Sequence, residues 1–372
     1  MKEVLTIVLL FALVGCSDQT LVGPPEPPPP GAQPDQIEPT IIVDEFLQRT
    51  AAASDILFTV DDSGSMSDVQ TKLISNFVTF GQHLFGSETD YHIGVVRGDI
   101  ILAPTDGQLV GFGAPPFFID TDTQYPDAAF QQIIQSIGSG GGGGCESGML
   151  ASRIALTAPL VHGYNDGFLR DEARLTIIMI SDEDDHANHA MCSNPEGHPD
   201  MWVPWFQSMK ARPDMLSLGI IAGFDPIDDI TPTDCIGNDV DRADAAPHYA
   251  VAAERTAAIT GSICRDDWFP VMNELGIAAA GLTRIFTLSR VPEWDTEDWD
   301  GDGNTNEPVL EIHLNRNDGN GDVNIMPVWD ANPDPRNPWD FDRVLNAVLF
   351  TVDTMPEEGW RLTARYPNAA EN

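Results

Sequence analysis

The sequence predicts an α/β fold: a doubly wound, mostly parallel sheet flanked by helices, followed by a small C-terminal β extension. Short β-branched runs recur along the chain and are apolar on successive residues, the pattern of strands buried on both faces of a parallel sheet. Stretches of helical period lie between these runs, and this alternation is typical of a layered α/β sandwich. In such folds the functional site lies at the carboxyl ends of the strands.

The expected elements alternate between residues 50 and 290. The strands are predicted at residues 55–60, 91–96, 175–181, 216–222 and 283–288. One helix is predicted after Ser67, and two more at residues 247–260 and 266–280. Ser67 and Asp68 suit a helix N-terminus, and Gly261 and Gly281 follow the ends of the two later helices.

The N-terminal residues predict an exported, lipid-anchored protein. Lys2 precedes an apolar run at residues 4–14, which is too short to span a bilayer comfortably and is interpreted as a secretory signal. The run ends in Leu13-Val14-Gly15-Cys16, which resembles the lipobox of bacterial lipoproteins, so Cys16 is the expected lipidation site. An ordinary cleaved signal is the alternative. We expect residues 1–16 to be signal and lipobox, and the protein to lie in the cell envelope, at the outer membrane.

A proline-rich segment separates the anchor from the folded part. Residues 24–39 contain eight prolines and almost nothing that could enter a core. Such a composition favours extended polyproline II. Residues 17–49 are therefore expected to form a stiff tether.

The charge balance restricts the class of partner. Asp and Glu outnumber Lys and Arg by 58 to 19, which gives a formal net charge of −39. With 42% hydrophobic residues the chain can still build a large core, so wholesale disorder is not expected. Phosphate groups repel a surface this acidic, which excludes nucleic acid as a binding partner. It attracts divalent cations instead.

One motif directly after the first predicted strand offers oxygen ligands for a metal. Asp61, Ser63 and Ser65 form the pattern Asp-x-Ser-x-Ser, with Gly64 letting the backbone turn. A carboxylate and two hydroxyls are hard ligands of the kind that Mg²⁺ and Ca²⁺ prefer. Hydroxyl ligands leave the ion under-neutralised, so it keeps affinity for one more carboxylate from outside.

With this motif and a second acidic loop at Ile180-Ser181-Asp182-Glu183-Asp184-Asp185, residues 50–290 resemble the von Willebrand factor type A domain. The motif resembles the metal-ion-dependent adhesion site (MIDAS) of that family. The resemblance implies that Ser63 and Ser65 bind the ion directly. It also implies that Asp61 and Asp182 bind it directly or through water.

One loop departs from the family's pattern. The family supplies a threonine from a loop before a middle helix, but residues 138–148 of this chain contain no threonine. Ser139 or Ser147 could provide the hydroxyl, or Glu146 could fill the position that a partner would otherwise take. The last arrangement would make the metal self-liganded and structural, and an impaired site is a further alternative.

Besides Cys16, the chain has four cysteines, an even number in an oxidising compartment. Three pairings are open, and the sequence does not choose among them. The fold that the resemblance implies favours Cys145 with Cys192 and Cys235 with Cys264.

Three other sequence patterns have simpler interpretations. Arg97-Gly98-Asp99 spells the tripeptide that integrins read in their ligands, but it follows a strand where the chain must turn anyway. Residues 182–198 hold three histidines among acids, yet their spacing matches no zinc signature. No nucleophile elbow, zinc-protease helix or phosphate-binding loop is present in the sequence, so an enzyme is not expected.

The C-terminal region, residues 291–372, carries a separate calcium signal. Asp298, Asp300 and Asp302, followed by Gly303 and Asn304, match the start of a calcium loop. The glutamate that ends an EF-hand loop is missing, so the segment is more similar to the aspartate-rich loops of thrombospondin type 3 and dockerin repeats. Later strands, predicted at residues 346–352 and 360–366, indicate a small β extension packed on the main domain.

Together these features predict a lipid-anchored binding or adhesion protein of the cell envelope. Mg²⁺ or Ca²⁺ at the MIDAS-like site would capture a carboxylate from a protein or glycan partner, and the membrane would be contacted through the lipid anchor only. A structural envelope protein whose metals only stabilise the fold is the first alternative. A metal-dependent hydrolase is the second.

Overall fold

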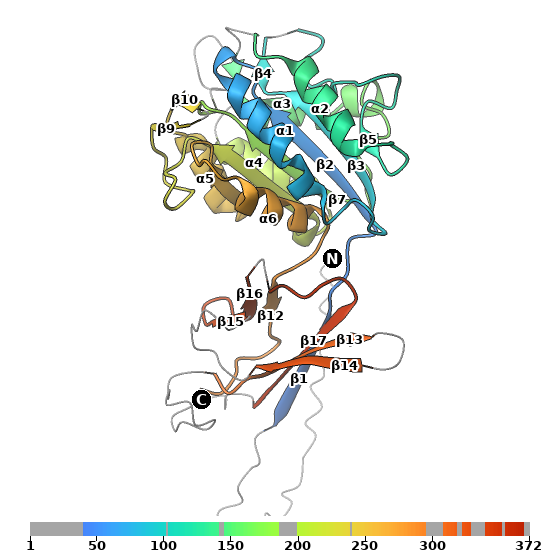
Figure 1. Ribbon diagram of the computed structural model, residues 1–372, viewed down its shortest axis with the longest axis vertical. Coiled ribbons are helices and arrows are strands. Elements are labelled where there is room, and N and C mark those ends of the chain that lie inside the picture. The colour runs from blue at the N-terminus through green and yellow to red at the C-terminus, as the bar shows by residue number, and fades with distance from the viewer. Residues whose placement is uncertain are drawn as a thin grey trace, which may run out of the picture. The chain divides into compact units, whose positions relative to one another are not determined.

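The computed structural model describes residues 40–101, 103–140, 145–185, 199–238, 240–294, 308–317, 322–328, 339–351 and 354–367. Within them the chain forms the predicted α/β fold around a six-stranded sheet (Figure 1). Its strands are β2 (Ala53–Val60), β3 (Asp90–Arg97), β5 (Ile119–Asp120), β7 (Arg174–Ile180), β8 (Leu216–Ala222) and β11 (Ile259–Ser262). The order is β11-β8-β7-β2-β3-β5, and all neighbours pair in parallel except β5, which is antiparallel to β3.

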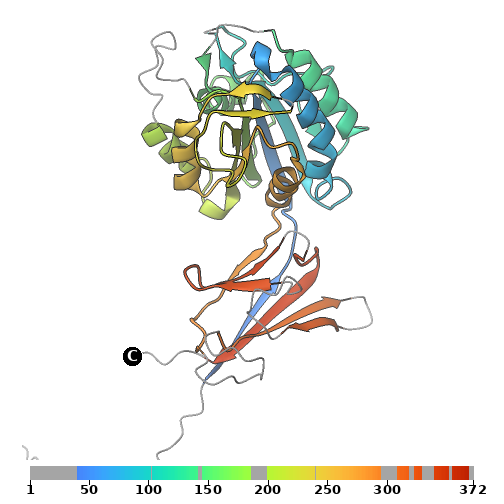
Figure 2. The same ribbon diagram turned by 60° about the vertical axis from the view of Figure 1, so that its left-hand side comes forward.

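Helices cover both faces of this sheet (Figure 2). One face carries α1 (Ser67–Gly81), α2 (Pro126–Ile137) and α6 (Phe269–Ala279). The other carries α3 (Gly148–Leu156), α4 (Pro199–Ser208) and α5 (Pro247–Thr256). Successive strand residues enter opposite cores: Ile56 and Phe58 join the first cluster and Leu57 the second. Burial on both faces explains why the strands are apolar without alternation.

The last parallel strand differs from the prediction. The sequence predicts a single helix over residues 247–260, but α5 ends at Thr256 and Ala257 takes the left-handed conformation, with φ of 50°. The chain then enters β11, whose Thr, Gly and Ser residues carry little strand signal. The predicted strand at residues 283–288 is β12 (Ile285–Thr287), which pairs with a C-terminal strand outside the main sheet.

Two smaller sheets hold the C-terminal β region. The first has the order β1-β17-β13-β14 and the second the order β12-β16-β15. Their strands are β1 (Ile41–Leu47), β13 (Glu311–Asn317), β14 (Asp322–Val328), β15 (Trp339–Asp342), β16 (Ala347–Phe350) and β17 (Trp360–Pro367). Buried side chains such as Leu314, Phe350 and Leu362 form a third hydrophobic cluster here.

Strand β1 corrects the predicted end of the tether. The prediction extended the tether to residue 49, whereas residues 41–47 pair antiparallel with β17 along their whole length. Their side chains alternate between exposed and partly buried positions, the period-2 pattern of a strand with one face on a core. Because these residues lie directly after the proline-rich segment, the prediction assigned them to the tether despite their alternation.

Several predicted features lie outside the described residues. These are the signal peptide, Cys16, most of the tether, Cys192 and the aspartate-rich loop at residues 298–304. Among the residues that are described, no helix is both long and apolar enough to cross a membrane.

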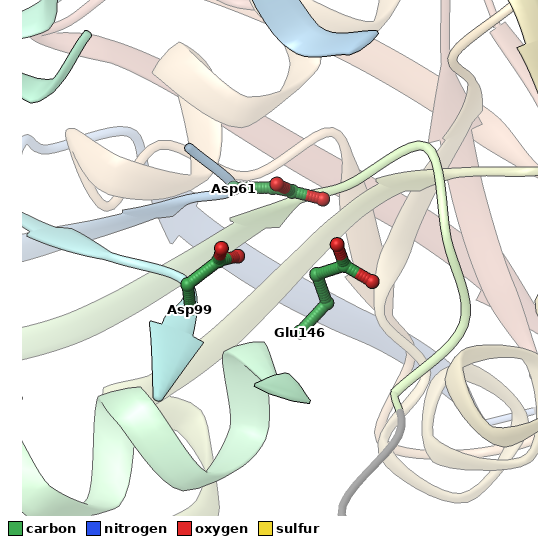
Figure 3. A group of neighbouring side chains, drawn as sticks. All are labelled: Asp61, Asp99 and Glu146. Atoms are coloured by element: carbon green, nitrogen blue, oxygen red, sulfur yellow. The ribbon is translucent and has the colours of Figure 1, made fainter. Parts of the chain in front are cut away.

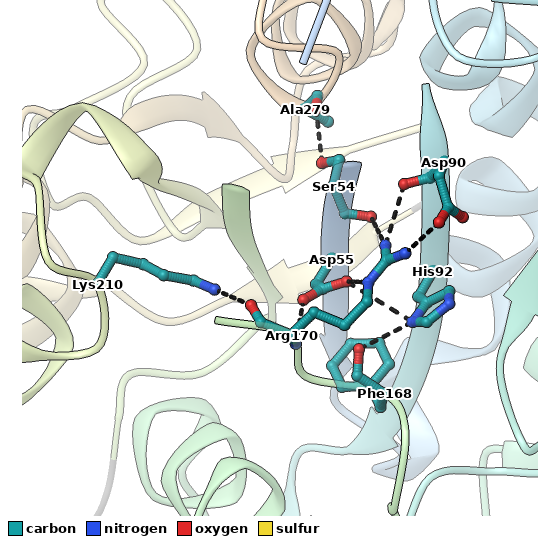
Figure 4. A network of polar contacts seen from close by, with 8 residues as sticks. All are labelled: Ser54, Asp55, Asp90, His92, Phe168, Arg170, Lys210 and Ala279. Atoms are coloured by element: carbon teal, nitrogen blue, oxygen red, sulfur yellow. Dashed lines mark hydrogen bonds and ion pairs between the residues drawn. The ribbon is translucent and has the colours of Figure 1, made fainter. Parts of the chain in front are cut away.

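A buried charge network joins the amino ends of the central strands (Figure 4). Asp55 of β2 is fully buried and accepts hydrogen bonds from the backbone N–H and Nε of Arg170, at 2.6 and 2.8 Å. The same guanidinium donates to the Asp90 carboxylate at 2.7 Å and to the Ser54 carbonyl at 3.3 Å. Burial raises the pKa of Asp55, and the hydrogen bonds and charge of Arg170 oppose the rise. This network fixes β2 and β3 at the end of the sheet opposite the candidate site.

Candidate metal centre

Three neighbouring strands each deliver an acidic residue to the same edge of the sheet. Asp61 follows β2, Asp99 follows β3, and Asp182 follows β7. Strands β3, β2 and β7 are adjacent and parallel, so their carboxyl ends meet at one place. The chain runs from β2 to β3 on one side and later crosses to β7 on the other side of β2, so the strand order reverses here, and open α/β sheets bind ligands at such a switch point.

A short strand pair adds a fourth carboxylate. Strand β4 (Asp99–Ile100) pairs antiparallel with β6 (Cys145–Glu146), and Asp99 lies directly opposite Glu146. Figure 3 shows the carboxyl groups of Asp61, Asp99 and Glu146 facing a common space. Each of the three contributes an oxygen atom that lies within 4.8 Å of the other two. Like charges placed opposite each other across two strands are destabilising unless something neutralises them.

Local hydrogen bonds hold the Asp-x-Ser-x-Ser turn. Asp61 accepts from the backbone N–H of Ser63 at 2.7 Å and from the hydroxyl of Ser181 at 2.6 Å. The hydroxyls of Ser63 and Ser65 lie 3.0 Å apart. Gly98 packs against this turn so closely that a Cβ atom there would lie 3.0 Å from the Asp61 backbone. Glycine in the tripeptide therefore lets the β3–β4 turn bring Asp99 beside Asp61.

Buried oxygen atoms without partners mark the centre. Both carboxylate oxygens of Asp99, which is only 5% exposed, have no hydrogen-bond partner. One carboxylate oxygen of Asp182, which is 2% exposed, also lacks a partner. An unsatisfied buried charged oxygen is costly, so each such atom in a native structure needs an explanation. A divalent cation among these oxygens supplies one.

In the cation-free chain the same crowding makes the carboxyl groups hold protons. Burial, followed by the negative charges of Asp61, Asp62 and Glu146, raises the pKa of Asp99 to about 8. Burial also raises the pKa of Asp61, opposed by its bonds from Ser181 and Ser63. The pKa of Asp182 is raised by burial as well. Protons and cations therefore compete for these oxygens.

The nearby residues divide into those at the centre and those that support it. The Ser65 side chain forms a hydrogen bond with Asp182, which joins the Asp-x-Ser-x-Ser turn to the acidic loop after β7. The Ser147 hydroxyl donates to Asp185 at 2.8 Å, and Asp185 also accepts from the N–H of Met149, so this pair fixes the start of α3. Ser139 lies beside the turn, with its backbone carbonyl facing Gly64.

Sequence reasoning missed Asp99. The Arg-Gly-Asp tripeptide predicts only a turn here, but Asp99 is the first acid after the second parallel strand, as Asp61 is after the first. Its neighbour Arg97 forms an ion pair with Asp62 at 3.4 Å. The tripeptide therefore belongs to this centre, and its Asp99 is buried.

One predicted disulfide is confirmed. Cys235 and Cys264 are bonded, with their Cα atoms 6.0 Å apart. The bridge joins β9 (Cys235–Gly237), which pairs with β10 (Val240–Ala243), to the segment after β11. The predicted pairing of Cys145 with Cys192 involves a residue outside the described ranges.

The strand order, the two helical layers and the acids at the carboxyl ends define a doubly wound fold of the von Willebrand factor type A and Rossmann-like kind, with a candidate acidic metal centre. No family model matches the chain, and no curated protein shows significant similarity.

Two solved structures of proximal thread matrix protein 1 from the mussel byssus, one of them described as crystal form 2, are similar to this chain. One has a TM-score of 0.35 at 13% identity over 63% of this chain, and the other 0.34 at 12% over 65%. In both cases the chain covers 49% of the mussel protein, about half its length. The fold assignment accordingly rests on the strand order and helical layers.

The raised pKa values predict that the cation-free protein loses stability as pH rises. Asp99 titrates near pH 4 when unfolded but near 8 when folded, so between these values the folded state binds more protons. The contribution of Asp99 to the stability of the folded state is therefore largest at low pH and is lost as pH approaches 8. In chelator, we expect the melting temperature to drop by several °C between about pH 5.5 and 8.5.

Melting curves of Asp99→Asn test this expectation. The variant cannot titrate at this position and should show a shallower slope, while Glu254→Gln, which removes an exposed carboxylate from α5, should keep the full slope. Equal slopes in the wild type and Asp99→Asn would contradict the prediction.

Proposed function

We propose that the chain is a divalent-cation-dependent binding protein that captures a carboxylate from a partner. Mg²⁺ or Ca²⁺ would be held by Asp61, Ser63, Ser65 and Asp182, the set that the resemblance implies, with Asp99 beside them. Anchoring through Cys16 at the outer membrane is part of the proposal, and so is the absence of a catalytic step.

One observation carries the proposal: buried carboxylates from three separate strand ends converge, and among the described residues no cationic side chain pairs with Asp99 or Asp182. Asp99 has two unpartnered oxygens, and Arg97, two residues before it in the chain, is paired with Asp62. The ligand atoms that the described residues gather here are oxygens, which Mg²⁺ and Ca²⁺ prefer, whereas zinc is bound more often by histidine and cysteine. A bound cation would convert mutual repulsion into attraction.

The surroundings support a protein partner. Large apolar side chains are exposed on the segment after β8: Ile227 is 89% exposed and Ile236 is 77% exposed. The backbone of Asp244, directly after β10, donates to the Asp182 carbonyl at 2.8 Å, which ties the β9–β10 hairpin to the centre. Exposed aliphatic side chains on this segment fit a polypeptide ligand better than a glycan, because a peptide offers apolar contacts as well as a carboxylate.

Hydrogen bonding among the described residues near the centre does not form a Ser-His-Asp arrangement. A Ser-His-Asp arrangement needs histidine between the hydroxyl and the acid. Here Ser147 donates directly to Asp185, and His248 bonds to a different acid, Asp184, at 2.5 Å.

A structural role for the metal is the second candidate. It is favoured by the burial of Asp61, Asp99 and Asp182, because an ion among them would tie together the ends of three strands. A purely structural ion would raise the melting temperature without any cation-dependent ligand binding.

Binding of the full chain to surfaces coated with poly-L-glutamate or poly-L-glutamine separates the two candidates. At physiological salt, where charge repulsion is screened beyond about 8 Å, we expect binding to poly-L-glutamate in Ca²⁺ or Mg²⁺, loss in chelator and little binding to poly-L-glutamine. Asp61→Asn should remove the cation-dependent signal. Equal binding to both polymers, or binding that survives chelator, would contradict carboxylate capture.

A further inference from the structure

The four carboxylates of the centre differ in their access to solvent. Asp61, Asp99 and Asp182 are 1%, 5% and 2% exposed. Glu146 is partly exposed, so of the four it is the one nearest to a ligand that arrives from solvent. An incoming carboxylate therefore meets Glu146 before it reaches the others.

Asp99 gives an independent reason to place a cation beside Glu146. Its side chain is more than nine-tenths buried, both its carboxylate oxygens lack a partner, and it points into the space that Glu146 also faces (Figure 3). An ion that satisfies Asp99 lies within reach of the Glu146 carboxylate, because oxygen atoms of the two residues are within 4.8 Å.

The backbone around Glu146 is held on both sides. Before it, Cys145 pairs with Ile100, and Glu146 itself pairs with Asp99. After it, the Ser147 N–H donates to the Gly98 carbonyl at 3.1 Å. Displacement of the Glu146 carboxylate must therefore occur by side-chain rotation, for which glutamate has one more rotatable bond than aspartate.

We infer that Glu146 is an internal competitor: its carboxylate occupies the position on the bound cation that a partner's carboxylate takes. The inference rests on the proposed function and concerns the regulation of the same site. A partner must displace Glu146, so the apparent affinity is reduced by the small fraction of molecules in which Glu146 has rotated away. The buried acids Asp61, Asp99 and Asp182 keep the ion during the exchange.

The test compares Glu146→Gln with Glu183→Gln, which removes one charge from the acidic loop after β7. Calorimetry with Mg²⁺ measures cation affinity, and poly-L-glutamate surfaces measure capture. We expect Glu146→Gln to bind Mg²⁺ up to about tenfold more weakly but, at saturating Mg²⁺, to bind poly-L-glutamate about tenfold more tightly. Glu183→Gln should change capture less than threefold. Glu146→Asp has a side chain one methylene shorter and should also bind the polymer more tightly than the wild type. This variant replaces Glu146→Gln in the test if the glutamine variant does not fold.

The outcomes separate the inference from the proposed function. If the wild type captures poly-L-glutamate and Glu146→Gln captures it no better than Glu183→Gln, the inference is overturned and carboxylate capture stands. If all variants bind Mg²⁺ but none binds the polymer, carboxylate capture fails and the inference fails with it.

Discussion

Asp61→Asn is expected to weaken Mg²⁺ binding at the centre by at least about 100-fold, a loss of roughly 2.8 kcal/mol. Asparagine keeps an oxygen for the Ser63 N–H and presents an amide toward the Ser181 hydroxyl, so the turn can still form. What it lacks is the negative charge that a divalent ion needs. Isothermal titration calorimetry of the full chain measures the change.

Glu254→Gln provides the matched control for Asp61→Asn, because it removes the same charge from an exposed position on α5. Its Mg²⁺ affinity should equal that of the wild type. If Asp61→Asn and Glu254→Gln bind Mg²⁺ equally well, the ion is held elsewhere and the centre is misassigned.

Arg170→Ala is expected to destabilise the protein by about 3–5 kcal/mol, the range for removing one partner of a buried ion pair. The substitution leaves the fully buried Asp55 with the backbone N–H of residue 170, and with His92 at 3.7 Å, in place of the guanidinium. It also removes the bond to Asp90. Denaturant unfolding in saturating Mg²⁺ measures the loss.

Arg242→Ala tests whether burial, and not the loss of an arginine, causes this effect. The Arg242 side chain is 68% exposed and pairs with the half-exposed Asp244 at 2.8 Å. Exposed pairs contribute about 0–1 kcal/mol, so this variant should unfold close to the wild-type midpoint. Similar losses for both arginine variants would contradict the proposed role of the buried network.

The central strands and the metal motif were readable from the sequence because their signals are local. Residues 55–60 and 175–181 are apolar without interruption, which only burial on both faces explains. Asp61 stands directly after the first of these runs, at the position where α/β folds place ligands. The predicted strand and the predicted metal motif therefore strengthened each other as predictions.

Features that depend on pairing between distant segments were not readable. The position of Asp99 after a strand was a local signal, but its pairing with Glu146, which is 47 residues further along the chain, appears only when β4 pairs with β6. Strand β1 depends on β17, more than 300 residues away, and the short β11 is a strand because it completes the edge beside β8. Local propensity is weak in β4, β6 and β11, so tertiary contacts decide their structure.

The central claim, that one divalent cation lies among Asp61, Asp99, Glu146 and Asp182, is tested most directly by an anomalous difference map from crystals soaked in Mn²⁺. We predict a peak at the carboxyl ends of β2, β3 and β7, with carboxylate oxygens of Asp61 and Asp99 at about 2.0–2.6 Å or joined to it through one water. A map in which Mn²⁺ occupies other sites while this space holds no ion would contradict the claim.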